Sequence, residues 1–150
     1  MNFLGIDYGQ KRIGLSIWHH DVGIVLPLEA IISDQRDKQI ARLSEIIRQN
    51  NITHLVIGYP INMDGSIGAK AKEVDLFIAA LQLVIPEHIL IHKSDERLTS
   101  ETAHSISRTF RSKESPKRKL KNRKRGIIDS QSAVLILQDF INEFPIHEQS

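Results

Sequence analysis

The first third of the chain alternates apolar and polar positions with the two-residue period of β-strands. Ile13, Leu15 and Ile17 fall on one face of the second such stretch, and the short link before it predicts a hairpin. Pro27 interrupts the third stretch, which predicts a bulged strand or an edge strand because proline has no amide hydrogen. The pattern therefore predicts three antiparallel strands, over residues 3–8, 12–18 and 24–32.

After residue 33 the apolar spacing changes to the period of helices. Ile40, Leu43 and Ile47 follow this period, and Ser33 or Asp34 can cap the start of the first helix. Helical stretches then alternate with short apolar runs, which predicts parallel strands joined by helical crossovers. We expect helices over 35–50, 68–84, 99–110 and 127–143, and strands over 53–58 and 88–93.

The order β-β-β-α-β-α-β-α-α predicts an α/β fold with a mixed five-stranded sheet flanked by helices, its first strand central and its fifth nearby. A length of 150 residues suits one domain, over residues 1–150, with a sizeable core. Hydrophobic residues make up 41% of the chain and charged residues 25%, which argues against wholesale disorder.

The net charge of +2 hides an uneven distribution. Residues 108–125 hold 10 of the 20 basic residues and one acid, so this segment carries +9 and the remainder −7. Its central part has no apolar periodicity, so we expect a mobile basic loop over 111–125; a solvated charged loop without function is the alternative. Such asymmetry is typical of proteins that bind a polyanion.

Cysteine is absent, which excludes disulfides, thiol catalysis and zinc–thiolate sites. No apolar run approaches the roughly 20 residues of a membrane span. The N-terminal residues lack the basic region of a signal peptide. We therefore expect a cytoplasmic protein that does not enter a membrane.

Carboxylates occur at the ends of predicted elements. Asp7 ends the first strand between two glycines, Asp95 and Glu96 follow the fifth strand, and Asp129 begins the last helix on its apolar face. Each could instead be a turn residue or an acid favoured by a helix N-terminus. If they converge, they repel one another unless a cation lies between them. Oxygen ligands suit Mg²⁺ or Mn²⁺, and such ions beside a basic loop suit phosphodiester hydrolysis.

Four motifs resemble, in order, those of the YqgF (RuvX) family of the ribonuclease H-like superfamily. They are Gly5-Ile6-Asp7-Tyr8-Gly9 with Lys11-Arg12-Ile13-Gly14, then Tyr59-Pro60-Ile61-Asn62-Met63-Asp64-Gly65-Ser66, then Asp95-Glu96-Arg97-Leu98-Thr99, and finally Gly126-Ile127-Ile128-Asp129, through Ala133 to Ile136-Leu137-Gln138. In this order they are spread over essentially the whole chain. Tyr59 and Ile61 stand where the family has leucine, and Ser66 where it has threonine.

Members of this family are described either as Holliday-junction resolvases or as nucleases that mature the 5′ end of precursor 16S rRNA. The resemblance implies a metal-dependent hydrolase in which Asp7, Glu96 and Asp129 are catalytic and bind Mg²⁺ or Mn²⁺. Consecutive strand residues point to opposite sides, so only one of Asp95 and Glu96 should enter the site, and we expect Glu96.

The expected partner is nucleic acid, either precursor rRNA or a DNA junction. If the substrate is precursor rRNA, the small ribosomal subunit is a further expected partner in ribosome biogenesis. We expect the chain itself to be a monomer or a weak dimer. Asn62 lies in a turn-rich loop at the carboxyl end of the fourth strand, which predicts a phosphate contact or, alternatively, a plain turn. The residues expected to contact nucleic acid are Lys11, Arg12, Asn62, Arg97, Lys117, Arg118, Lys119, Lys121, Arg123, Lys124 and Arg125.

Two other classes of function remain open at this point. A non-catalytic factor that binds RNA or the ribosome would keep the basic loop but need no metal. A phosphotransferase of the actin-like ATPase class also begins with a Gly-x-Asp-x-Gly turn, although such enzymes need two similar domains and 150 residues supply one.

Overall fold

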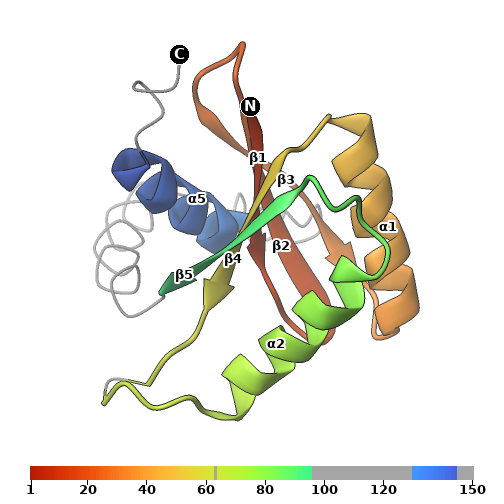
Figure 1. The fold of residues 1–150 in the computed structure, drawn as a ribbon, viewed down its shortest axis with the longest axis vertical. Coiled ribbons are helices and arrows are strands. Elements are labelled where there is room, and N and C mark those ends of the chain that lie inside the picture. Colours follow the sequence, from red (N-terminus) through yellow and green to blue (C-terminus); the bar gives the residue numbers. More distant parts are fainter. Residues whose placement is uncertain (63, 96–129, 145–150) are drawn as a thin grey trace, which may run out of the picture.

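The computed structural model describes residues 1–62, 64–95 and 130–144, and Figure 1 shows how their helices and strands are arranged. The helix predicted over 99–110 and the predicted basic loop over 111–125 lie outside these residues. In chain order the elements are β1 (Asn2–Asp7), β2 (Arg12–His19), β3 (Val25–Ile32), α1 (Arg36–Gln49), β4 (His54–Tyr59), α2 (Ala69–Gln82), β5 (Leu90–Asp95) and α5 (Gln131–Glu143).

The five strands form one mixed sheet in the order β3-β2-β1-β4-β5. The pairs β1–β2 and β2–β3 are antiparallel, whereas β4 lies parallel to both β1 and β5. This confirms the predicted fold class and the central position of the first strand. Pro27 lies on the edge strand β3, as its missing amide hydrogen predicts. The fifth strand forms the other edge, with β4 between it and β1.

Helices cover both faces of the sheet (Figure 1). On one face, α1 and α2 bury the apolar stripes that the sequence predicts, including Leu43 and Leu81, against the sheet. On the other face, α5 packs Ile136 and Leu137 against Phe3 and other residues of the sheet. We call these the α1/α2 face and the α5 face. No helix among the described residues is long and apolar enough to cross a membrane.

The start of α1 differs from the prediction. Gln35 is the N-cap residue and no side chain caps the helix, so the expected cap by Ser33 or Asp34 is wrong. The Ser33 hydroxyl instead accepts a hydrogen bond from the Gln35 amide at 3.1 Å, in the turn before the helix. The buried Gln39 amide donates to the carbonyls of Gln10 at 2.9 Å and Ser33 at 2.8 Å. Gln39 thus holds the helix start against the β1–β2 turn.

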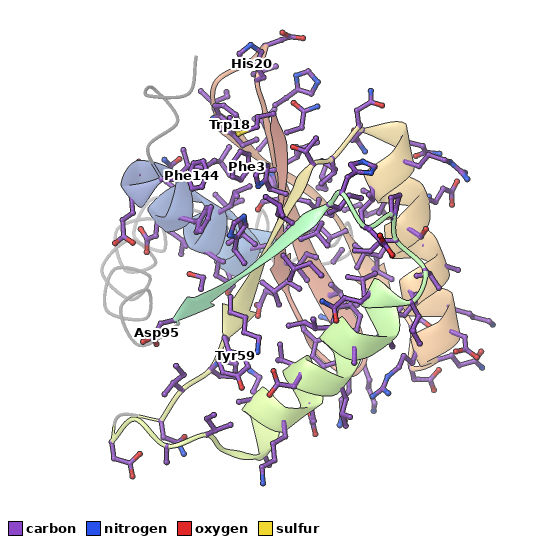
Figure 2. The ribbon with its side chains drawn as sticks, viewed as in Figure 1. Phe3, Trp18, His20, Tyr59, Asp95 and Phe144 are labelled. Atoms are coloured by element: carbon purple, nitrogen blue, oxygen red, sulfur yellow. The ribbon has the colours of Figure 1, made fainter. Side chains whose placement is uncertain are left out.

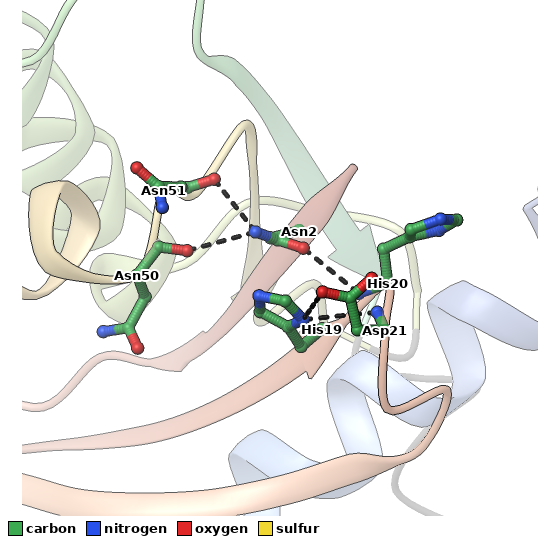
Figure 3. Close-up of polar contacts among 6 residues, drawn as sticks. All are labelled: Asn2, His19, His20, Asp21, Asn50 and Asn51. Carbon is green, nitrogen blue, oxygen red and sulfur yellow. Dashed lines mark hydrogen bonds and ion pairs between the residues drawn. The ribbon is translucent and has the colours of Figure 1, made fainter.

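At the other end of the central strand, the buried side-chain amide of Asn2 joins the amino end of β1 to its neighbours (Figure 3). The Asn2 side chain donates to the carbonyls of Asn50 at 3.1 Å and Asn51 at 3.2 Å, and accepts from the His20 amide at 3.1 Å. Asn51 has a φ of 52°, in the left-handed region that asparagine tolerates better than most residues. One side chain therefore ties the β2 end and the α1–β4 turn to the central strand.

Replacing Asn2 with alanine is expected to lower the free energy of unfolding by about 2 kcal/mol, because it removes three partly buried hydrogen bonds to the backbone. Urea unfolding followed by circular dichroism should show a lower midpoint with an unchanged m value. Gln49→Ala is the control, since it removes an exposed amide with one local hydrogen bond to Glu45. Equal midpoints for the two variants would contradict the role of Asn2.

Candidate active site

Asp7 is the last residue of β1, at the edge of the sheet where the parallel strands β1, β4 and β5 end; we call this the carboxyl edge. Its partly buried side chain lies on the α5 face and hydrogen-bonds the side chain of Ser132 in α5. Two residues earlier, Gly5 lets α5 approach: a Cβ placed there would lie 2.9 Å from the Ala133 carbonyl oxygen. The close approach at this glycine is therefore made by the backbone of α5.

Burial raises the pKa of the Asp7 carboxyl above its ordinary value. The positive charge of Lys70, in the first turn of α2, and the hydrogen bond with Ser132 lower the pKa by less. The ionised carboxylate is therefore less well solvated here than in water. A bound cation would relieve that cost, so the environment of Asp7 is suited to a metal ligand.

This pKa shift gives a stability prediction. Asp7 binds its proton more tightly in the folded protein than in the unfolded chain, so protonation of this carboxyl stabilises the fold. That stabilisation is complete below pH 3.8, the unfolded value, and is lost as pH rises through the folded pKa. In a chelating buffer at pH 7, Asp7→Asn should therefore be at least as stable as wild type. Thermal melts at pH 3 and pH 7 test this, because the advantage should appear only at the higher pH; a clear loss of stability at pH 7 would contradict it.

Serine side chains fix the start of α5 on the sheet. The fully buried Ser130 hydroxyl accepts from the Leu15 amide at 3.2 Å and donates to the Leu28 carbonyl at 2.6 Å. Ser16 donates to the Ala133 carbonyl at 2.7 Å. Leu15 pairs with Ile6, next to Asp7, so these bonds hold the first turn of α5 beside the end of β1. Asp129 lies outside the described residues and precedes Ser130 by one peptide bond.

Asp95 is the last residue of β5 and lies at the carboxyl edge (Figure 2). His92 packs against Phe140 on the α5 face, whereas Lys93 contacts Asp75 of α2. Alternation along the strand puts Asp95 on the same side as Lys93, the α1/α2 face, opposite Asp7. The described strand thus does not bring Asp95 and Asp7 together.

Of the other predicted site residues, Lys11, Arg12 and Asn62 lie within the described residues and the rest lie outside them. Lys11 and Arg12 are exposed at the turn between β1 and β2, at the carboxyl edge. No three acidic, histidine or cysteine side chains able to hold a metal lie together within 1–62, 64–95 and 130–144. Outside the described residues lie Glu96, Arg97, Asp129, Lys117, Arg118, Lys119, Lys121, Arg123, Lys124 and Arg125.

Asn62 belongs to a hairpin that projects from the carboxyl edge between β4 and α2 (Figure 1). Its side-chain amide donates to the Ser66 hydroxyl at 3.0 Å, and its backbone amide to the Ser66 carbonyl at 3.0 Å. The Ser66 hydroxyl in turn donates to Asp64 at 2.7 Å, and an isolated β-bridge joins Ile61 to Ile67. The turn-rich motif therefore forms a self-bonded hairpin with an exposed Asn62.

Some residues near the site have no signal in the sequence that could have identified them. Ser132 and Lys70 both act on Asp7, yet they lie more than 60 residues away from it in the chain. They approach Asp7 because α2 begins and α5 packs at the carboxyl edge. The fourth motif predicts that the last helix begins near Asp7, but it does not single out Ser132, and no motif marks Lys70.

Comparisons with known proteins identify the family of this chain. A family model described as "RuvX: Holliday junction resolvase" matches residues 1–143. A protein of Opitutus terrae with the name "Putative pre-16S rRNA nuclease" is 41% identical over 147 residues, which cover 97% of this chain and 94% of that protein. A relative of the same name from Ruminiclostridium cellulolyticum is 39% identical over the full length of both chains.

Solved structures show the same fold at low sequence identity. RuvC of Thermus thermophilus, in complex with a Holliday-junction substrate, matches with a TM-score of 0.57 and 13% identity over 95% of this chain and 96% of that one. The Holliday-junction resolvase of fowlpox virus matches with a TM-score of 0.56 and 9% identity over 96% of this chain and all of that one. The fold is therefore that of the ribonuclease H-like resolvases. With the family match over residues 1–143, this chain belongs to the RuvX (YqgF) family.

Proposed function

We propose that this protein is a metal-dependent nuclease that hydrolyses phosphodiester bonds of structured nucleic acid. Its proposed reaction is the maturation of the 5′ end of precursor 16S rRNA during ribosome biogenesis. Membership of the RuvX family and the names of the relatives in Opitutus and Ruminiclostridium support this assignment. The proposed substrate implies that the protein acts in the cytoplasm, with the small ribosomal subunit as its wider partner.

The observation that carries the proposal is the position of Asp7. A partly buried carboxylate with a raised pKa lies at the carboxyl edge of the central strand, beside the anchored start of α5. That edge is where open α/β sheets bind their ligands. Lys11 and Arg12 are exposed at the same edge, where they could attract a phosphate backbone.

Asp7, Glu96 and Asp129 are the proposed ligands of Mg²⁺ or Mn²⁺. Asp7 fits this role, because it offers a hard oxygen donor in an environment that penalises its unbalanced charge. Glu96 follows Asp95, and continued alternation of β5 would turn it to the α5 face that Asp7 occupies. When bound, such an ion supplies charge neutralisation at the phosphate and lowers the pKa of the attacking water.

The chain's own residues have separate roles in this scheme. Ser132 orients the Asp7 carboxylate through its hydrogen bond, and Lys70 adds positive charge beside it. The basic loop over 111–125 would bind the phosphate backbone next to the last helix. Aromatic residues make up only 5% of the chain, which favours recognition of backbone and shape over base stacking.

A side-by-side cleavage assay tests the proposal. A 5′ fragment of precursor 16S rRNA and a four-way DNA junction are incubated with the protein in Mg²⁺, in Mn²⁺ and in chelator. We expect metal-dependent cleavage of the RNA and little cleavage of the junction. The reverse preference would favour the second candidate, a Holliday-junction resolvase, which the description of the family model supports.

Binding measured on the same two substrates separates catalysis from recognition. Tight RNA binding without cleavage in either metal would contradict the nuclease assignment. It would favour a non-catalytic factor that binds RNA or the ribosome.

A further inference from the structure

Three side chains form a hydrogen-bonded cluster at the carboxyl edge, on the face opposite Asp7. The Tyr59 hydroxyl donates to one carboxylate oxygen of Asp75 at 2.8 Å, and the Lys93 ammonium donates to the other at 2.8 Å. The same ammonium lies 4.6 Å from the centre of the Tyr59 ring. We call Tyr59, Asp75 and Lys93 the clamp.

The clamp joins the elements from which the hairpin between β4 and α2 arises. Tyr59 is the last residue of β4, immediately before the hairpin, and Asp75 lies in α2, into which the hairpin leads. Lys93 adds the neighbouring strand β5. The same carboxylate therefore joins the strand before the hairpin to the helix after it and to β5.

The hairpin itself is closed by its own hydrogen bonds between Asn62 and Ser66. Pro60 and Gly68 join this closed hairpin to β4 and α2, so the relative position of these two elements sets where the hairpin projects. Figure 2 shows Tyr59 at this base, where the chain leaves the sheet. The Tyr59–Asp75 contact thus fixes the two elements from which the exposed Asn62 projects.

Tyr59 stands where the family motif has leucine, which cannot donate this hydrogen bond. We propose that the clamp residues are positioning residues for nucleic-acid binding, which hold the hairpin tip against the phosphate backbone of the substrate. This inference rests on the proposed nuclease function. Without the clamp, part of the binding energy must be spent on ordering the hairpin.

The test measures the Kd of a fluorescent 5′ fragment of precursor 16S rRNA in chelator, for wild type, Tyr59→Phe and Asp75→Asn. Tyr59→Phe keeps the ring and removes only the hydroxyl, and we expect its Kd to rise about fivefold, as the loss of one hydrogen bond allows. Asp75→Asn removes a negative charge, so electrostatics alone would tighten RNA binding, whereas loss of the clamp weakens it. Tighter or unchanged binding by Asp75→Asn would overturn the inference.

Glu45→Gln is the matched control. It also removes an exposed acid from an ion pair, with Arg42 at 3.1 Å, but on α1 and away from the hairpin. Its Kd should stay within about twofold of wild type, since exposed ion pairs contribute little. A purely structural role for the clamp would lower the melting temperature and leave the Kd unchanged, which would also overturn the inference.

A double-mutant cycle shows whether the clamp acts through the hairpin. If it does, Asn62→Ala should weaken binding less in the Tyr59→Phe background than in wild type. Additive effects would mean that the clamp acts elsewhere, against the inference. Cleavage by the wild-type protein separates this inference from the proposed function. If wild type cleaves but the Kd does not change in Tyr59→Phe, the nuclease assignment stands and the role of the clamp is rejected. If wild type does not cleave, the nuclease assignment itself is rejected.

Discussion

Replacing Asp7 with asparagine is expected to reduce metal-dependent cleavage of the RNA fragment by more than about a hundredfold. Loss of the outer partners of a metal ligand alone costs 10- to 100-fold, so loss of a proposed ligand should cost more. Asparagine keeps the size of the side chain and can still bond Ser132. RNA binding should therefore stay within about threefold of wild type, because no positive charge has been removed. Single-turnover cleavage and Kd measurements test both statements.

Asp95→Asn is the matched control for this experiment. It makes the same chemical change at the same edge of the sheet, but on the α1/α2 face. We expect it to retain most of the cleavage activity. If Asp95→Asn removed activity as fully as Asp7→Asn, the assignment by strand alternation would be wrong. If Asp7→Asn failed to fold, the catalytic assignment of Asp7 would fail instead.

The hydrophobic pattern was sufficient to predict the described helices and strands and the fold class. The period of the apolar residues depends on local geometry, so Leu43 of α1 and Leu81 of α2 could be placed on buried stripes without knowledge of their partners. The proline of β3 indicated an edge strand for an equally local reason. Most boundaries moved by one or two residues, as for β5, because helix and strand ends depend on their neighbours. The sequence predicts that the last helix begins at residue 127, whereas α5 begins at Gln131, after the N-cap residue Ser130.

Other features could not be predicted because they depend on contacts distant in the chain. The start of α1 has Gln35 at its N-cap position in place of Ser33 or Asp34, and Gln39 holds it to the β1–β2 turn, a contact that the helix pattern does not contain. The environment of Asp7 depends on Ser132 and Lys70, which only the packing of α5 and α2 brings near. The sequence could place Asp95 near the end of a strand. The face of the sheet on which Asp95 lies follows only from the contacts of Lys93 with Asp75 and of His92 with Phe140.

Replacing Gly5 with alanine is expected to lower the free energy of unfolding by about 3 kcal/mol, at the upper end of the cost of overpacking a core. The added Cβ would lie 2.3 Å from the Ser16 hydroxyl oxygen, 2.8 Å from Leu137 Cβ and 2.9 Å from the Ala133 carbonyl oxygen. The last of these is backbone of α5, so the helix must move away from β1. For a chain of this length the melting temperature should fall by roughly 10 °C.

The displacement also predicts a loss of activity in the molecules that remain folded. α5 is held through Ser16 and Ser130, and a shift of this helix moves its first turn away from Asp7. Cleavage measured well below the melting temperature should therefore fall more than about tenfold. Gly23→Ala is the control: the added Cβ meets nothing within 4 Å, although its φ of +78° makes alanine strained by about 1 kcal/mol. If Gly5→Ala cost no more stability than Gly23→Ala, close packing of α5 on the central strand could not be what positions the site.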